Sequence, residues 1–246
     1  MRLKARRISV IVFSFGLIIA WILINPASYK EIFTPVKNTG AEAGLDFSSE
    51  AVTEAQESAP LASDLLAELE VKGRAPKTGY SREEFYDGWP LIDGCSLRQR
   101  ILKREMGDTA ILDECNVISG EFDEPYTGEH LVLKTRDEVS KLQIDHVVAL
   151  SDAWQKGAQY KSYEIRNAIA TDPLNLLAVD GASNQQKSDG DAATWLPKNK
   201  RFRCQYVARQ VSVKYKYELW VTEAEKEAIL RILSNCPNEP AIGVTK

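Results

Sequence analysis

The sequence predicts a mixed α+β domain, and the arrangement of its apolar segments supports this class. Two short apolar runs, residues 142–150 and 174–179, have the length and flanking residues typical of buried strands. Segments with apolar residues at helical spacing lie before and after them. This order lacks the regular strand–helix alternation that predicts a parallel sheet, so we expect α+β rather than α/β.

Composition sets broad limits. The chain has 246 residues, enough for one domain with a real core and additional segments. With 44% hydrophobic and 27% charged residues, wholesale disorder is excluded. The net charge of −4 gives no general reason to bind a polyanion, yet residues 184–216 contain eight basic and two acidic side chains. This basic stretch is the part of the chain best suited to a polyanionic partner.

The first residues are typical of a targeting segment. Four basic residues precede an uncharged apolar run at residues 8–24, which just reaches the length needed to span a bilayer. Because no clear small-residue cleavage pattern follows, we expect residues 1–25 to be an uncleaved signal anchor, with a cleaved signal peptide as the alternative. In both cases the rest of the chain is exported. It would face the periplasm or extracellular side from the inner membrane, or be secreted after cleavage.

The next segment has the composition of a linker. Between Glu31 and Val71 there are nine acidic residues and one basic residue, among many small and polar ones. We therefore expect residues 26–75 to form an acidic flexible linker, in which residues 61–69 could form a short amphipathic helix. The folded domain is then expected over residues 76–240.

The first half of this domain shows several start and stop signals. Ser81 with Glu84 matches a capping box at the start of a helical turn. Residues 96–106 have apolar residues at helical spacing and end at Gly107. Residues 110–135 are expected to form short strands and turns.

The second half contains the two strands and three further helices. The first of these helices should begin at residues 151–154, directly after the first strand. After the strand at 174–179, a turn at 180–181 should lead into a short helix at 182–188. A well-capped helix is expected at 222–233, because Thr222 and Glu225 have the spacing of a capping box.

Cysteine usage agrees with export. The chain has four cysteines, Cys95, Cys115, Cys204 and Cys236, and no C-x-x-C pair of the kind that zinc sites normally show. In an oxidising compartment two disulfides are expected. Of the three possible connectivities we expect the local one, Cys95–Cys115 with Cys204–Cys236, and each bond should stabilise the fold by about 3 kcal/mol.

The residues with the clearest chemical potential lie around one of only two histidines, His130 and His146. His146 directly follows Asp145 in a predicted strand, and two asparagines follow downstream. An imidazole with its ordinary pKa of about 6.5 suits proton transfer at neutral pH. Neighbouring strand residues point to opposite faces, so a kink or bulge is needed if both serve one site. The alternatives are a structural histidine and a carboxylate that holds a turn.

In order and spacing these residues resemble the HNH, or ββα-metal, endonuclease superfamily. Within this superfamily, the sequence most resembles the branch that includes exported bacterial nucleases and the C-terminal nuclease domain of some modification-dependent restriction enzymes. The resemblance covers roughly residues 80–236. It is carried by the segments Ile144-Asp-His-Val-Val-Ala-Leu150, Asn175-Leu-Leu-Ala-Val179, Asn184-Gln-Gln-Lys-Ser-Asp189, Trp195-Leu-Pro197, Cys95-Ser-Leu-Arg98 and Pro125-Tyr-Thr-Gly128.

The resemblance implies a ββα-metal core with surrounding helices and a role for each site residue. His146 would be the general base, and Asn175 would tie the loop between the strands and orient it. Asp145 and Asn184 would hold a divalent metal ion. Asn184 stands where many members have histidine, and oxygen ligands favour Mg²⁺, with Mn²⁺ or Zn²⁺ as alternatives.

Several basic residues are candidates for binding nucleic acid. Lys187 lies one helical turn after the second predicted metal ligand and could hold a phosphate, or could be a solvated lysine. Arg98 is a further candidate for a phosphate contact. Lys198, Lys200 and Arg201 would bind backbone phosphates without reading bases, which predicts low sequence specificity and strong salt dependence.

Together these features predict a metal-dependent endonuclease that acts on DNA, with RNA left open, outside the cytoplasm. Its partners would be the nucleic acid and, if the anchor is uncleaved, the membrane; no protein partner is predicted. The alternative is a membrane-tethered nucleic-acid-binding module without hydrolytic activity, which the asparagine at position 184 would permit. A hydrolase of a cell-wall polymer has less support, because no glycosidase-like carboxylate pair is evident.

Overall fold

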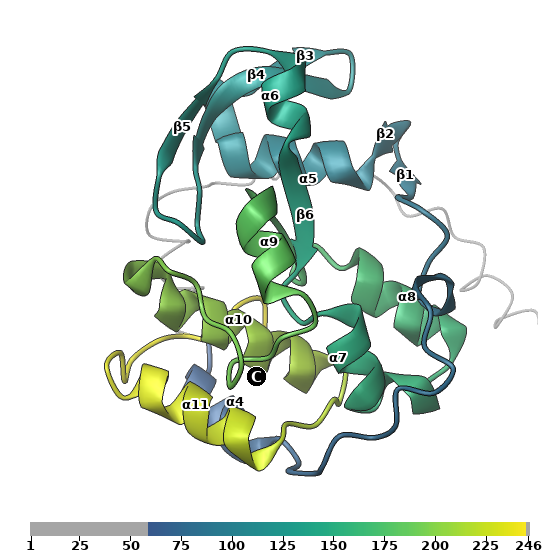
Figure 1. Cartoon of the computed structure of the whole chain (residues 1–246), viewed down its shortest axis with the longest axis vertical. Helices are drawn as coiled ribbons and strands as arrows, with labels where there is room; N and C mark the ends of the chain where they lie inside the picture. Colours follow the sequence, from purple (N-terminus) through teal and green to yellow (C-terminus); the bar gives the residue numbers. More distant parts are fainter. Residues whose placement is uncertain (1–58, 245–246) are drawn as a thin grey trace, which may run out of the picture. The chain divides into compact units, whose positions relative to one another are not determined.

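A computed structural model describes residues 59–244, and its architecture is mixed α+β, as predicted (Figure 1). The expected signal segment, residues 1–25, and residues 26–58 of the expected linker lie outside the described residues. Between residues 59 and 244, no helix has both the length and the apolar character needed to cross a membrane.

Within residues 59–244 the strands form three small antiparallel sheets. The first pairs two short strands, the second has the order β3-β4-β5, and the third pairs β6 with β7. Their bounds are β1 (Leu91–Ile92), β2 (Cys95–Ser96), β3 (Ile111–Asp113), β4 (Asn116–Asp123), β5 (His130–Leu133), β6 (Leu142–His146) and β7 (Leu176–Asp180).

Helices surround these sheets. The α-helices are α4 (Ala62–Glu68), α5 (Leu97–Met106), α6 (Arg136–Ser140), α7 (Leu150–Gln155), α8 (Tyr163–Thr171), α9 (Gly181–Lys187), α10 (Arg203–Lys216) and α11 (Glu223–Leu233). Single 3₁₀ turns are η1 (Arg82–Glu84), η2 (Gly107–Thr109), η3 (Ala158–Tyr160) and η4 (Lys200–Phe202).

Local capping explains where several helices start. Ser96 accepts a hydrogen bond from the backbone of Gln99 at the start of α5, and Thr222 accepts one from the backbone of Glu225 at the start of α11. Both helices were predicted, α5 from the helical spacing of its apolar residues and α11 from its cap. The prediction at Ser81 is wrong: only the 3₁₀ turn η1 follows, and the Ser81 side chain makes no capping bond to it.

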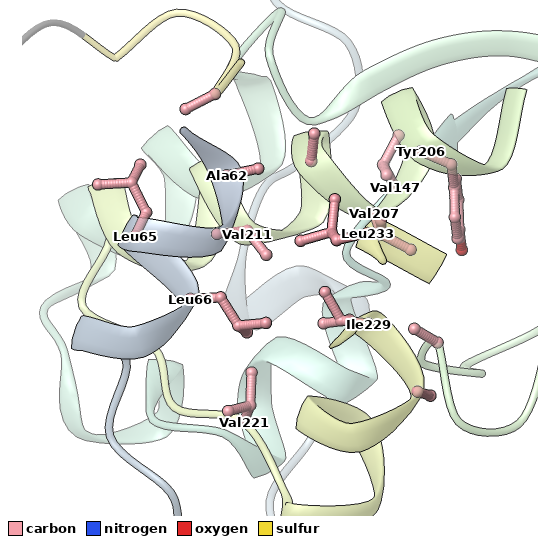
Figure 2. Packing of buried hydrophobic residues seen from close by; sticks show 14 of the residues in the cluster. Ala62, Leu65, Leu66, Val147, Tyr206, Val207, Val211, Val221, Ile229 and Leu233 are labelled. Atoms are coloured by element: carbon pink, nitrogen blue, oxygen red, sulfur yellow. The ribbon is translucent and has the colours of Figure 1, made fainter. Parts of the chain in front are cut away.

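The folded part of the chain starts well before residue 76. In α4, Leu65 and Leu66 are fully buried against α10 and α11 (Figure 2). The expected flexible linker therefore does not extend to residue 75. The short amphipathic helix expected at residues 61–69 is present as α4. Its packing could not be predicted from the acidic composition, because the apolar surface that these leucines cover comes from helices more than 130 residues later.

The two-stranded β6–β7 sheet lies between two apolar clusters. Ile144 and Leu176 belong to the cluster beneath α5, whereas Leu177 and Val179 belong to the cluster formed with α4, α10 and α11. Since successive strand residues point to opposite faces, both faces of this two-stranded sheet are covered. This packing holds the last residues of β6 in a fixed place.

Both predicted disulfides are present. Cys95–Cys115 joins β2 to the turn between β3 and β4, and Cys204–Cys236 joins the first turn of α10 to the segment after α11. Each bond therefore connects elements that the sheets do not hold together.

A buried ionic network connects the helices on the side of α7. Lys156 has no exposed side-chain surface and contacts three carboxylates at 2.6–2.8 Å. The three cations and three anions of the network are Arg74, Lys156 and Lys214 with Asp152, Asp191 and Glu225. Equal numbers of each sign allow five of these charged groups to be buried together, while Arg74 reaches them from the surface.

Candidate active site

The candidate site is built on a ββα unit formed by β6, β7 and α9. β6 and β7 pair in antiparallel register through Asp145–Leu177 and His146–Leu176, and α9 follows β7 directly. The side chain of Asp180 caps α9 by accepting a hydrogen bond from the backbone of Ser183. The strand–strand–helix order therefore matches the core that the resemblance implies.

A cavity of about 490 Å³ lies at the end of β6. Asp145 and His146 from β6 and Asn184 from α9 all line it, so the fold brings these three predicted residues together. Of the expected kink or bulge, a bulge is not present, since β6 and β7 pair in regular register. Instead β6 ends at His146, and both of its last residues border the cavity at the strand end.

His146 is held by a hydrogen bond and by aromatic packing. Its Nε2 lies 2.9 Å from the carbonyl oxygen of Ala170, which can only accept, so Nε2 carries the proton. The ring stacks on Trp89 with a centroid distance of 6.0 Å and an interplanar angle of 9°, and Tyr86 packs at 5.8 Å. A neutral ring held in this tautomer keeps its lone pair on Nδ1.

The electrostatic surroundings of His146 differ from the expectation of an ordinary imidazole. Burial, followed by the positive charge of Arg82, lowers the pKa of His146 to about 3. The prediction of a pKa near 6.5 is therefore wrong, because the sequence does not show that the ring is buried. The consequence is a neutral imidazole throughout the neutral pH range.

Asp145 lies in a dense set of hydrogen bonds. Its Oδ1 is 2.9 Å from Nζ of Lys187, and its Oδ2 is 2.5 Å from the hydroxyl of Tyr126. Burial raises the pKa of this carboxyl group, and the charge of Lys187 opposes that shift. The carboxylate is thus fixed in position by two side chains from different elements.

The predicted phosphate contact by Lys187 is wrong. The lysine is 1% exposed, and its Nζ donates to Asp145 and to the backbone carbonyl of His146, at 2.8 Å for the latter. The alternative, a solvated lysine, is also wrong, because the side chain is buried. The side chain runs from α9 inward and neutralises Asp145, so it cannot reach a substrate in solvent.

Asn175 is fully buried and does not line the cavity. Its Oδ1 accepts a hydrogen bond from the backbone of Val148 at 2.8 Å, and its Nδ2 donates to the carbonyl of Ile169 at 3.0 Å. Its own carbonyl accepts from the backbone of Val147 at 2.8 Å. These bonds tie the chain after His146 to the end of α8, which carries the carbonyl that holds the imidazole.

The other predicted basic residues lie away from this cavity. Arg98 donates to the carbonyl of Leu142 at 2.8 Å and therefore holds β6 rather than facing the site. Lys198, Lys200 and Arg201 are exposed, and Arg201 lines a second cavity. The expected contact of Arg98 with phosphate is thus replaced by a structural bond within the protein.

Asp145 and Asn184 supply donors that fit a hard divalent cation. Nδ2 of Asn184 donates to Oε1 of Gln143 at 2.9 Å, which orients the amide. Within residues 59–244, no hydrogen-bond donor reaches its Oδ1. One carboxylate and one amide oxygen beside an open cavity suit Mg²⁺, which usually keeps several waters and few protein ligands.

Sequence reasoning missed the wall of the cavity that precedes β1. Lys77, Tyr80 and Arg82 line the cavity from this side. The carboxyl group of Asp189 accepts a bond from Lys77 at 2.8 Å, and this contact holds its pKa below the ordinary range. Ser81-Arg82 matched only a capping motif, so the sequence carried no sign that these residues meet the histidine.

Comparison with known proteins agrees with this geometry. The C-terminal domain of GmrSD restriction endonucleases matches residues 100–232, which is more than half of the chain. The chain therefore belongs to this family of restriction-endonuclease C-terminal domains, within the HNH nuclease superfamily.

A fungal relative extends the similarity beyond that region. An uncharacterized secreted protein of Arthroderma benhamiae (strain ATCC MYA-4681 / CBS 112371) is 36% identical over 182 residues, covering 73% of this chain and 86% of the relative. No solved structure matches the chain.

Proposed function

We propose that this protein is an exported, metal-dependent endonuclease that hydrolyses phosphodiester bonds of DNA, and of RNA if the cavity accepts it. The main observation that supports this proposal is that His146, Asp145 and Asn184 line one open cavity on a ββα unit. Membership of a restriction-endonuclease domain family supports nuclease chemistry. Two disulfides and a secreted relative support export.

In this proposal His146 is the general base. Burial keeps the imidazole neutral, and the negative charge of a bound phosphate would raise its pKa toward the neutral range, where a base is effective. The Ala170 carbonyl holds the Nε2 proton, so Nδ1 accepts the proton of the attacking water. The water oxygen bonds to phosphorus, the bond from phosphorus to the 3′ oxygen breaks, and a solvent proton completes the 3′-hydroxyl. The products carry a 5′-phosphate and a 3′-hydroxyl.

Asp145 and Asn184 would hold the divalent metal ion, which when bound polarises the phosphate and stabilises charge on the leaving oxygen. Tyr126 and Lys187 keep the Asp145 carboxylate in place for this role. The exposed residues Lys198, Lys200 and Arg201 would contact backbone phosphates without reading bases, so cleavage should show low sequence specificity.

The test is plasmid nicking by the purified full-length protein with Mg²⁺ or Mn²⁺, with and without EDTA. In His146→Gln the new side chain can still donate toward Ala170 but lacks the ring lone pair. We expect nicking to slow by a factor of about 100 or more. His130→Gln is the matched control, since His130 is the other histidine and lies exposed on β5. Equal nicking by His146→Gln and the wild type would reject the general-base role.

One observation favours a second candidate function, nucleic-acid binding without hydrolysis. Asp145 already bonds Lys187 and Tyr126, so a cation must share its oxygens with both. Calorimetric titration with Mg²⁺ and Mn²⁺ separates the two functions. Intact DNA affinity with no metal binding and no nicking would favour the binding module.

A further inference from the structure

We propose that Arg82 binds the phosphate group that undergoes cleavage, and that the segment before β1 completes the substrate site. This inference rests on the proposed function and adds the residue that supplies positive charge to the cavity. Arg82 lies outside residues 100–232, the region that the family match covers. The site would therefore include a segment outside the matched region.

The position of Arg82 supports this role. Its side chain is exposed and lines the same cavity as His146, Asp145 and Asn184. A phosphate bound in this cavity would have the guanidinium on one wall and the residues of the ββα unit on the other.

Charge pairing across the cavity distinguishes Arg82 from its neighbours. The Lys77 ammonium is paired with Asp189 at 2.8 Å, and the Asp145 carboxylate is paired with Lys187 at 2.9 Å. Arg82 has no carboxylate within ion-pair distance in the described part of the chain. Of the charged side chains in the cavity wall there, it is the one whose charge is left for a ligand, and an anion is the ligand it favours.

Arg82 is also held in an orientation that leaves donors open. Its Nε and Nη2 donate to the hydroxyl of Tyr86 at 2.9 and 2.6 Å, and Tyr86 in turn packs against the His146 ring. The Nη1 donors take no part in these bonds. A guanidinium held along one edge presents its other edge to a phosphate, where charge-assisted bonds are strong.

The experiment measures binding of a fluorescein-labelled DNA duplex in EDTA, where the proposed hydrolysis does not occur, at several salt concentrations. For Arg82→Gln we expect affinity to fall about tenfold. The slope of log K against log salt should decrease in magnitude by about 0.9, the value of one phosphate contact. Arg82→Lys should keep the slope but bind more weakly than wild type, because it loses the fork of donors.

Three further variants sharpen the result. Lys77→Gln removes a charge from the same wall that is already paired, so its slope should change by less than half as much. Arg231→Gln removes an exposed charge on α11, which does not line the cavity, and should bind like wild type. Tyr86→Phe keeps the ring and frees the guanidinium, so its affinity should fall less than that of Arg82→Gln.

The outcomes separate this inference from the proposed function. If the wild type binds and nicks DNA while Arg82→Gln keeps the wild-type affinity and slope, the role of Arg82 is rejected and the nuclease stands. A wild type that neither binds nor nicks DNA would reject both. Thermal unfolding of each variant shows whether a loss of binding reflects a loss of folding.

Discussion

At the scale of single residues, the contact between Asp145 and Lys187 combines structure and function. The lysine is buried, and the carboxylate that it neutralises is the proposed metal ligand. A buried charge in this position without its partner would lower the free energy of unfolding, since burial removes the water that would otherwise solvate it. The pair therefore allows a carboxylate to exist at the end of β6.

We predict that Lys187→Met destabilises the protein by about 3–5 kcal/mol, because it leaves Asp145 buried without a counter-charge. Urea unfolding followed by circular dichroism gives the change. Lys198→Met, at an exposed lysine, should change stability by less than about 0.5 kcal/mol. In the double variant Asp145→Asn with Lys187→Met, the loss should be smaller than the sum of the single losses. Strict additivity would show that the two side chains do not act as a pair.

At the scale of elements, the ionic network joins α7, α10, α11 and the loop after α9. Asp191 comes from that loop and contacts Lys156 at 2.8 Å and Arg74 at 2.6 Å. Burial alone would raise the pKa of Asp191, but these two cations prevail and lower it to about 2. The folded state therefore binds this proton less readily than the unfolded chain does.

This shift predicts how stability depends on pH. A lowered folded-state pKa contributes stability that is fully present above the unfolded value of about 4 and is lost as pH falls toward about 2. Asp191→Asn should therefore reduce the free energy of unfolding by about 3–5 kcal/mol at pH 7. The difference from wild type should narrow between about pH 4 and pH 2. Urea unfolding over this range tests the prediction, and a difference independent of pH would contradict it.

At the scale of the whole molecule, the disulfides connect segments that the sheets leave separate. Cys204–Cys236 closes a loop with a sequence separation of 32 and fixes the end of α11 against the start of α10. This region also packs against α4 through Leu65 and Leu66. Formation of the Cys204–Cys236 bond therefore stabilises the apolar cluster that covers one face of the β6–β7 sheet.

We predict that replacing Cys204 and Cys236 together by serine lowers the free energy of unfolding by roughly 3 kcal/mol, chiefly by enlarging the unfolded ensemble. Guanidinium unfolding of the variant and of the oxidised wild type gives the difference. The wild type unfolded in the presence of a reductant should show a loss at least as large. Unchanged stability in both cases would mean that packing alone holds this cluster.

Much of the fold and part of the site were predictable from local signals. The caps of α5 and α11, the two disulfides, and the β6–β7–α9 order depend on neighbouring residues or short spacings. The helices α6, α8 and α10 were missed. In α10, Lys214 was counted as part of a basic surface, yet it is buried against Asp152 and Glu225. Its burial depends on partners far away in the sequence.

By itself, the sequence determined the fold class, the expectation of two disulfides and the order of the Asp-His, Asn and Asn residues, since these follow from composition, spacing and local capping. The local disulfide pairing was one of three possible connectivities, and the structure confirms it. Only the tertiary structure decided which charged side chains are paired within the protein and which remain available to bind a ligand. It buries Lys187 against Asp145, turns Arg98 toward the β6 backbone, and brings Arg82 from before β1 to the cavity of His146. The physical reason is that burial and charge pairing depend on distances between elements, which a single sequence does not record.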